Sequence, residues 1–152
     1  MSRDRREEIL VRLLAIGGEF DPENVRQAFR NKDEIGERDR PCVRLFDGDE
    51  AESDQSAQAQ HRGGLRPTVM VMLPVMSIEL GGTPEAVGTD LNSRRLKLIG
   101  AVKRDAALAS IVGANGAVHY RGLVTSFSPG RRVEAVMNLQ FAIAYPLIAS
   151  EL

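Results

Sequence analysis

The 152-residue sequence contains no tryptophan, only 5% aromatic residues and a single cysteine, Cys42. Few aromatic residues argue against a surface on which nucleic-acid bases stack. A single cysteine excludes an internal disulfide framework and favours a reducing compartment such as the cytoplasm. The longest apolar run, residues 68–78, is too short to cross a bilayer and contains Pro74. We therefore expect one globular domain, residues 1–152, with no membrane partner.

Motifs that carry chemistry are also missing from the sequence. Cys42, His61 and His119 lack the spacing of zinc ligands. The glycine-rich stretch "GGTPEAVGT" lacks both the Lys-Ser/Thr pair of a phosphate loop and a dinucleotide fingerprint. No Gly-x-Ser-x-Gly elbow or Ser/His/Asp group stands out. We expect neither an enzyme nor a cofactor, and the formal net charge of −1 argues against sequence-specific nucleic-acid binding.

Charge is distributed unevenly along the chain. Residues 1–60 carry 15 acidic and 10 basic side chains, whereas residues 61–152 carry 6 acidic and 10 basic ones. This asymmetry suits a protein that stacks between two different partners. Charges that are simply scattered over a solvated surface explain the same counts, so both interpretations stay open.

An acidic, polar segment follows residue 46. Its start, "DGDEAESD", resembles the opening of a calcium loop, but the glycine at the sixth position and the glutamate at the twelfth are missing. We expect no specific metal site there. The segment at about 47–65 has almost no apolar residue to anchor it, which predicts a flexible loop that is either functional or disordered.

Two segments have helical periodicity. The first covers residues 2–18, where Ser2 is a candidate cap and Gly17-Gly18 a candidate end. The second begins at Thr83-Pro84 and is followed by a short helix that Asp105 caps and Gly113 ends. Its apolar stripe consists of Val87, Leu91, Leu98 and Val102.

Strand patterns cover much of the remaining chain. Residues 25–29 alternate like a short strand, although Asp21-Pro22 also reads as a helix start. Residues 40–48 form a clearer strand closed by a turn. Residues 65–80 are apolar on both faces and predict one buried strand, with a bulge or a move to the sheet edge at Pro74. Residues 117–127 predict a strand that is joined by a hairpin at 128–130 to the final one.

The final strand, residues 131–145, is the longest alternation in the chain. One face is apolar throughout, and Ala142 and Ala144 make both faces apolar at its far end. The far end of the strand is therefore expected to be covered on both sides. The apolar face consists of Val133, Ala135, Met137, Leu139, Phe141, Ile143 and Tyr145.

The order of these elements predicts the fold class. Strands come in adjacent runs and do not alternate regularly with helices. We expect an α+β domain with a mainly antiparallel sheet, packed by the N-terminal helix and a central helix and ending in a long β-hairpin.

Five segments follow one another along the chain in a characteristic order. They are "RDRREEILVRLLAI", "RPCVRLFDGDEAE", "RPTVMVMLPVMSI", "VGTDLNSRRLKLIGAVKRDAALASIVGANGAVHYRG" and "GRRVEAVMNLQFAIAYPLIASEL". Their order and content resemble the tail terminator family of long-tailed bacteriophages, prophages and gene-transfer particles. The resemblance spans nearly the full length and is strongest at "LFDGDE", at the helix pair and at the closing strand. Residues 19–34 and the loop around 55–66 depart from the family pattern, which puts the early strand pairing in doubt.

The resemblance implies a non-enzymatic structural protein. Such proteins assemble in the bacterial host cytoplasm into a ring, commonly of six copies, at the head-proximal end of the virion's tail tube. The ring stops tube polymerisation and joins the tail to the head completion or connector protein, and DNA passes through it. A head-side neck or adaptor protein, or a small cytoplasmic protein-binding module, remains the alternative.

A closed ring needs two different patches that meet on neighbouring copies. The doubly apolar end of the last strand and the acidic loop are the candidate places for these contacts, although a central strand covered only by its own helices explains the same pattern. Basic side chains are candidate partners for acidic patches, and solvated faces are the alternative for each. The candidate interface residues are Asp47, Asp49, Glu50, Glu52, Arg94, Arg95, Lys103, Arg131, Arg132, Phe141 and Tyr145.

Overall fold

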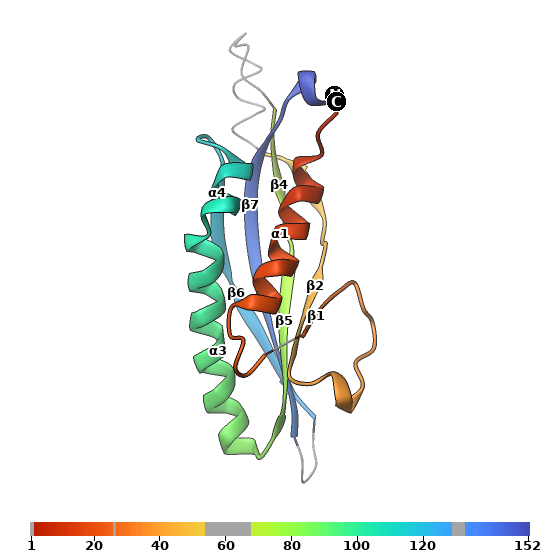
Figure 1. The fold of residues 1–152 in the computed structure, drawn as a ribbon, viewed down its shortest axis with the longest axis vertical. Helices are drawn as coiled ribbons and strands as arrows, with labels where there is room; N and C mark the ends of the chain where they lie inside the picture. Colours follow the sequence, from red (N-terminus) through yellow and green to blue (C-terminus); the bar gives the residue numbers. More distant parts are fainter. Residues whose placement is uncertain (1, 26, 54–67, 129–132) are drawn as a thin grey trace.

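The computed structural model describes residues 2–25, 27–53, 68–128 and 133–152. It shows the α+β fold that the sequence predicts, and the described helices pack on one face of a long, twisted sheet (Figure 1). The helices are α1 (Arg5–Glu19), α3 (Pro84–Arg104) and α4 (Ala106–Val112), with short 3-10 turns η1 (Glu37–Asp39) and η2 (Ala149–Glu151). The strands are β1 (Gln27–Arg30), β2 (Cys42–Phe46), β3 (Glu50–Glu52), β4 (Thr68–Met72), β5 (Val75–Gly82), β6 (Ala117–Phe127) and β7 (Val133–Leu147).

Strand β7 is the centre of the sheet. On one side it pairs with β6, and on the other side it pairs first with β5 and then with β4. Beyond these, β2 pairs with β5 and β3 pairs with β4. All of these pairs are antiparallel, so the expected mainly antiparallel sheet with a β6–β7 hairpin pair is confirmed. The exception is β1, which lies parallel to β2 because residues 31–41 carry the chain back to the start of β2.

The run around Pro74 differs from the expected single strand. It forms β4 and β5, which keep one register against β7: Met72 pairs with Ile143, and Val75 pairs with Gln140. The Pro74 carbonyl accepts a hydrogen bond from the Phe141 N–H at 3.1 Å. The run lies between β7 and the β2–β3 side of the sheet, so the expected move to an edge is wrong.

The irregularity is shared with the neighbouring strand, where three residues separate β2 from β3. Gly48 has φ +71 there, and a Cβ on it would lie 2.0 Å from the Leu73 carbonyl oxygen. Only glycine allows the two backbones to approach so closely. The bulge expected near Pro74 is therefore present, and its extra residue lies on the β2–β3 side.

The core lies between the helices and one face of the sheet. The described members of the predicted apolar face of β7, from Ala135 to Tyr145, are buried, which confirms the alternation. Helix α3 buries the four predicted stripe residues and no others. Because side chains alternate across a strand, the residues between those of the apolar face point to the opposite side of the sheet.

Both ends of α1 differ from the prediction. Asp4, not Ser2, caps the helix: its side chain accepts a hydrogen bond from the Glu7 N–H at 3.0 Å. The helix continues through Gly17 and Gly18 to Glu19. Gly17 is buried, and a Cβ on it would lie 3.1 Å from Val43 Cγ1. The glycine at position 17 therefore lets the helix approach β2 and does not end it. The predicted cap of α4 by Asp105 and its end at Gly113 are confirmed.

Candidate interaction surfaces

The four acidic candidates lie together along one edge of the sheet. Asp47 and Asp49 occupy the irregular stretch after β2, and Glu50 and Glu52 belong to β3. The predicted loop therefore begins with a strand, because the backbone of residues 50–52 pairs with residues 70–72 of β4. Such pairing orders a polar segment that buries little apolar surface of its own. The remainder of the predicted loop, from residue 54, lies outside the described residues.

Glu50 and Tyr145, both candidates from the sequence, meet on the helix-covered side of the sheet. The Tyr145 hydroxyl donates a hydrogen bond to Glu50 Oε2 at 2.5 Å, and Arg6 Nε lies 3.4 Å from the same oxygen. Burial first, and then the bond to Glu50, raise the pKa of Tyr145 above its usual value. The phenol is therefore neutral and acts as a donor that ties β7 to β3. The two side chains also line a hollow of about 570 Å³ beside the chain ends.

Three of the basic candidates, Arg94, Arg95 and Lys103, lie on α3. Arg94 of α3 makes an ion pair with Asp21 at 3.0 Å, and the Asp21 side chain is only 4% exposed. This contact joins α3 to the connection that follows α1. Arg95 is half-buried and Lys103 is exposed near the end of α3. Arg131 and Arg132 lie outside the described residues.

Phe141 belongs to the core of a single copy. Its side chain is fully buried and contacts Tyr120, with 5.8 Å between the ring centroids. Tyr145 is also buried. Neither side chain is therefore on the surface, where a neighbouring copy could contact it. The residues between them that point to the opposite face of the sheet, Ala142 and Ala144, are half-buried.

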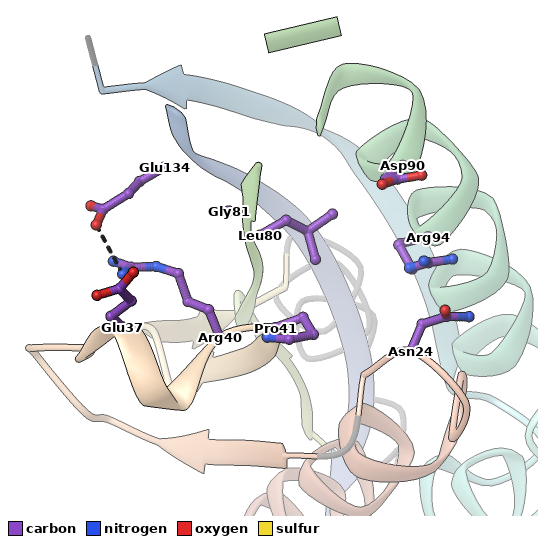
Figure 2. Close-up of a pocket in the computed structure, with 9 residues that line it drawn as sticks. All are labelled: Asn24, Glu37, Arg40, Pro41, Leu80, Gly81, Asp90, Arg94 and Glu134. Atoms are coloured by element: carbon purple, nitrogen blue, oxygen red, sulfur yellow. Dashed lines mark hydrogen bonds and ion pairs between the residues drawn. The ribbon is translucent and has the colours of Figure 1, made fainter. Parts of the chain in front are cut away.

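A hollow of about 340 Å³ lies at the end of the sheet where β5 leads into α3 (Figure 2). Arg40 enters it from the connection between β1 and β2 and donates a hydrogen bond to Glu134 Oε1 at 3.1 Å. Asp90 and Arg94 enter it from α3 on the other side. Side chains of both signs line the hollow, which does not favour a ligand of one charge. The lining residues are Asn24, Glu37, Arg40, Pro41, Leu80, Gly81, Asp90, Arg94 and Glu134.

A buried charge network beside this hollow was not predicted from the sequence. The Glu79 side chain is 3% exposed and makes an ion pair with Arg44, while Arg40 lies 3.9 Å away. Arg44 also donates to the backbone carbonyls of Lys32 and Asp33. The connection between β1 and β2 thus covers part of the sheet face on which no described helix packs. A glutamate as the one charged residue of the run "VMSIEL" was the available signal, because a buried acid needs a partner.

The remaining part of this second face has no described helix over it. Here β7 presents Val136, Asn138, Gln140, Ala142, Ala144 and Pro146, all half-buried. Val71 and Ala117 flank Ala144 on the neighbouring strands. We call this surface, from Val136 to Pro146 of β7 with its flanking residues, the open face. The sequence predicted that the far end of β7 would be covered on both sides. The described helices cover it on one side only.

No protein-family model matches the chain, and no curated protein sequence matches it. Within the described residues, no group of three or more His, Cys, Asp or Glu side chains is placed to hold a metal ion. The same part of the chain contains no helix that is long and apolar enough to cross a membrane.

Proposed function

We propose that this chain is a structural subunit of a ring at the head-proximal end of a bacteriophage tail tube. In this role the ring ends tube polymerisation and joins the tail to the head connector, without catalysing a reaction or holding a cofactor. Its partners are other copies of the chain, commonly six in all, the tail tube protein and the head completion or connector protein. Two lines support the proposal: the order of the sequence segments described above, and a sheet whose described helices all lie on one side.

The one-sided sheet is the observation that carries the proposal. On β7 the residues from Ala135 to Tyr145 that face the helices are buried, whereas Ala142 and Ala144, on the other side, remain half-buried. Small apolar residues on a sheet face that no described helix covers favour contact with another protein surface. A ring subunit needs such a surface because it contacts neighbours within the ring as well as the rings above and below.

The first test is native mass by light scattering at low and high protein concentration, followed by sedimentation with purified tail tubes. A discrete closed oligomer that sediments with tubes is the expected result. Sedimentation with capsids instead of tubes would favour the head-side adaptor. A chain that stays monomeric and binds neither particle would overturn the proposal.

A pair of matched variants links the test to the open face. Ala144→Glu places a charge in the middle of that face, whereas Ala109→Glu places one on the exposed side of α4. We expect Ala144→Glu to reduce tube binding or oligomer formation at least tenfold, because a carboxylate would have to be buried at the contact. Ala109→Glu is expected to bind like the parent. Equal binding by both variants would remove the open face from the contact.

A further inference from the structure

Strand β6 forms one long edge of the sheet. In the part of the chain that the structure describes, it pairs with β7 alone, over residues 117–127. Its other side therefore presents backbone N–H and C=O groups that can pair with another strand. Proteins usually protect such an edge with proline, lysine or another charge, but residues 122–127, "GLVTSF", have none of these. Val124 and Phe127 are also more than half exposed, at 55% and 52%. This edge is suited to being paired.

The opposite edge of the sheet offers a strand at the same height. Following the pairs across the sheet, Ser126 is level with Val136, Glu79, Cys42 and finally Gln27. In the same way, Leu123 is level with Arg30 at the far end of its row. Residues 123–126 of β6 therefore lie level with the whole of β1. Strand β1 pairs only with β2 among the described residues, so its outer side is also an edge.

The strand directions at these two edges are complementary. Strand β6 is antiparallel to β7, as is β5, so β5 and β6 run in the same direction. Strand β2 is antiparallel to β5, and β1 is parallel to β2. It follows that β1 runs antiparallel to β6. If a second copy is placed beside the first without being turned over, its β1 meets β6 in the antiparallel arrangement, whose hydrogen bonds are perpendicular to the strands.

Charges of opposite sign also lie at the same height on the two edges, although Asp47 there is already paired with Arg30 of its own copy at 2.9 Å. A row is here a set of residues that pair with one another across successive strands. His119 and Arg121 of β6 lie between the row that starts at Val118 and the row that starts at Gly122. Across the sheet these rows end at Glu50 and Phe46, so the same height on the opposite edge holds Asp47 and Asp49. Residues 117–127 contain no acidic side chain, and residues 47–52 contain no basic one. A second copy of the chain is therefore the occupant that fits both the strand direction and the charge of this edge.

We propose that copies of the chain join edge to edge, with residues 123–126 of β6 pairing antiparallel with β1 of the next copy and Ser126 opposite its Gln27. This join is heterologous, since two different edges meet, and it closes into a ring when each copy is rotated by the same angle. The inference deepens the proposed function by naming the subunit contact, and it rests on that function only for the ring's place in the particle.

The spacing of strands gives the scale of such a ring. Five strands, β6, β7, β5, β2 and β1, cross the sheet at the height of the join, and at about 4.8 Å per strand each copy adds about 24 Å to the circumference. Six copies would form a circle of about 144 Å, which is about 46 Å across at the strand backbones. Such a ring has an open centre, as a tail through which DNA passes requires.

Disulfide cross-linking tests the join directly. The variant Ser126→Cys/Gln27→Cys is made in a Cys42→Ala background, because Gln27 pairs with Cys42 inside one copy. Opposite residues in an antiparallel pair lie about 4.5–5.5 Å apart between Cα atoms, within the range of a disulfide. Oxidation of the assembled protein should give covalent multimers, and a mixture of the two single variants should give covalent dimers only. Ser126→Cys/Asn92→Cys, with the second cysteine on exposed α3, is the control that should not cross-link.

The outcomes separate this inference from the proposed function. A closed oligomer by light scattering without cross-linking of the 126–27 pair would overturn the edge-to-edge join and leave the ring intact. Cross-linking of Ser126→Cys with itself would also overturn it, since that result requires a two-fold contact. Cross-linked, open-ended chains that do not bind tubes would support the join but contradict the proposed function.

A second pair of variants tests the edge without cysteine. Val124→Lys adds an edge charge to β6, and Leu96→Lys makes the same kind of change at an exposed leucine of α3. We expect Val124→Lys to raise the concentration needed for assembly at least tenfold while its midpoint of thermal unfolding as a monomer stays unchanged. Leu96→Lys should assemble like the parent. Equal assembly by the two variants would overturn the inference.

Discussion

The two faces of β7 are made by the same strand but differ in what covers them. One face packs against α1, α3 and α4 and holds residues such as Leu139 and Phe141 with no exposed surface. The other face is half-buried, with small apolar residues at one end and a buried charge network at the other. The helix-covered face thus builds the fold, whereas the open face has no described helix over it.

The largest expected effect is on the helix-covered face. Phe141→Ala removes a fully buried ring that contacts Tyr120, and we expect the free energy of unfolding to fall by about 4 kcal/mol. Gln140→Ala, one residue away on the open face, should change it by less than about 0.5 kcal/mol. Urea unfolding followed by circular dichroism measures both. Similar losses in the two variants would contradict the difference between the faces.

The second prediction concerns the part of the open side that the β1–β2 connection covers. Glu79→Gln leaves Arg44 without its buried carboxylate, and we expect a loss of about 3 kcal/mol in the free energy of unfolding. Glu134→Gln removes only an exposed partner of Arg40 and should cost less than about 1 kcal/mol. Denaturant unfolding of the two variants compares them. An equally small effect for Glu79→Gln would show that residues 31–41 do not exclude water from this pair.

A smaller effect is expected in the helix layer, where Arg12 of α1 donates two hydrogen bonds to Asp105 at 2.8 and 2.7 Å. These bonds hold the pKa of Asp105 below its usual value. The folded protein then binds fewer protons than the unfolded chain as the pH falls, so this stabilisation is present above about pH 4 and is lost below it.

Asp105→Asn keeps a residue that can cap α4 but removes the charge. We expect it to cost about 1 kcal/mol at pH 7. The difference from the parent should shrink as the pH is lowered from 4 towards 2, as measured by thermal unfolding across that range. A difference that stays constant with pH would assign the loss to the cap and not to the ion pair.

The last prediction concerns the chemical reactivity of a buried thiol and involves no change in stability. Cys42 lies fully buried in β2, on the side of the sheet that residues 31–41 cover, and burial raises its pKa to about 11. At pH 8 we expect its thiol to react with a soluble thiol reagent at least a hundredfold more slowly in the folded protein than in 6 M urea. Fast reaction in the folded state would show that the β1–β2 connection opens readily.

Local patterns predicted much of the covered face correctly. The alternation in β7, the stripe of α3 and the cap at Asp105 each depend on neighbours within one element, so their spacing along the chain was sufficient. The ends of α1 were predicted wrongly because Gly17 acts through Val43, a contact between distant parts of the chain. The parallel β1–β2 pair was missed for the same reason, as its register is set by the path of residues 31–41.

The structure shows where the described candidate interface residues lie within a single copy. Among the residues chosen from the sequence, Phe141 proved to be core and Arg94 an ion-pair partner of Asp21. Glu50 and Tyr145 were both chosen, but their contact with each other could not be seen from positions 95 residues apart in the chain. The role of these residues in assembly stays a prediction.

For the periodic segments such as α3 and β7, the sequence by itself determined whether they are helix or strand and which face is apolar, because these properties repeat at 3.6 or 2 residues. Only the tertiary structure decided which sheet face the helices cover, where Pro74 lies, and which buried charges meet. It also decided that β6 and β1 form opposite edges of matching height and opposite direction. These features depend on pairing between distant segments, for which the free energy comes from surfaces that are brought together only when the whole chain folds.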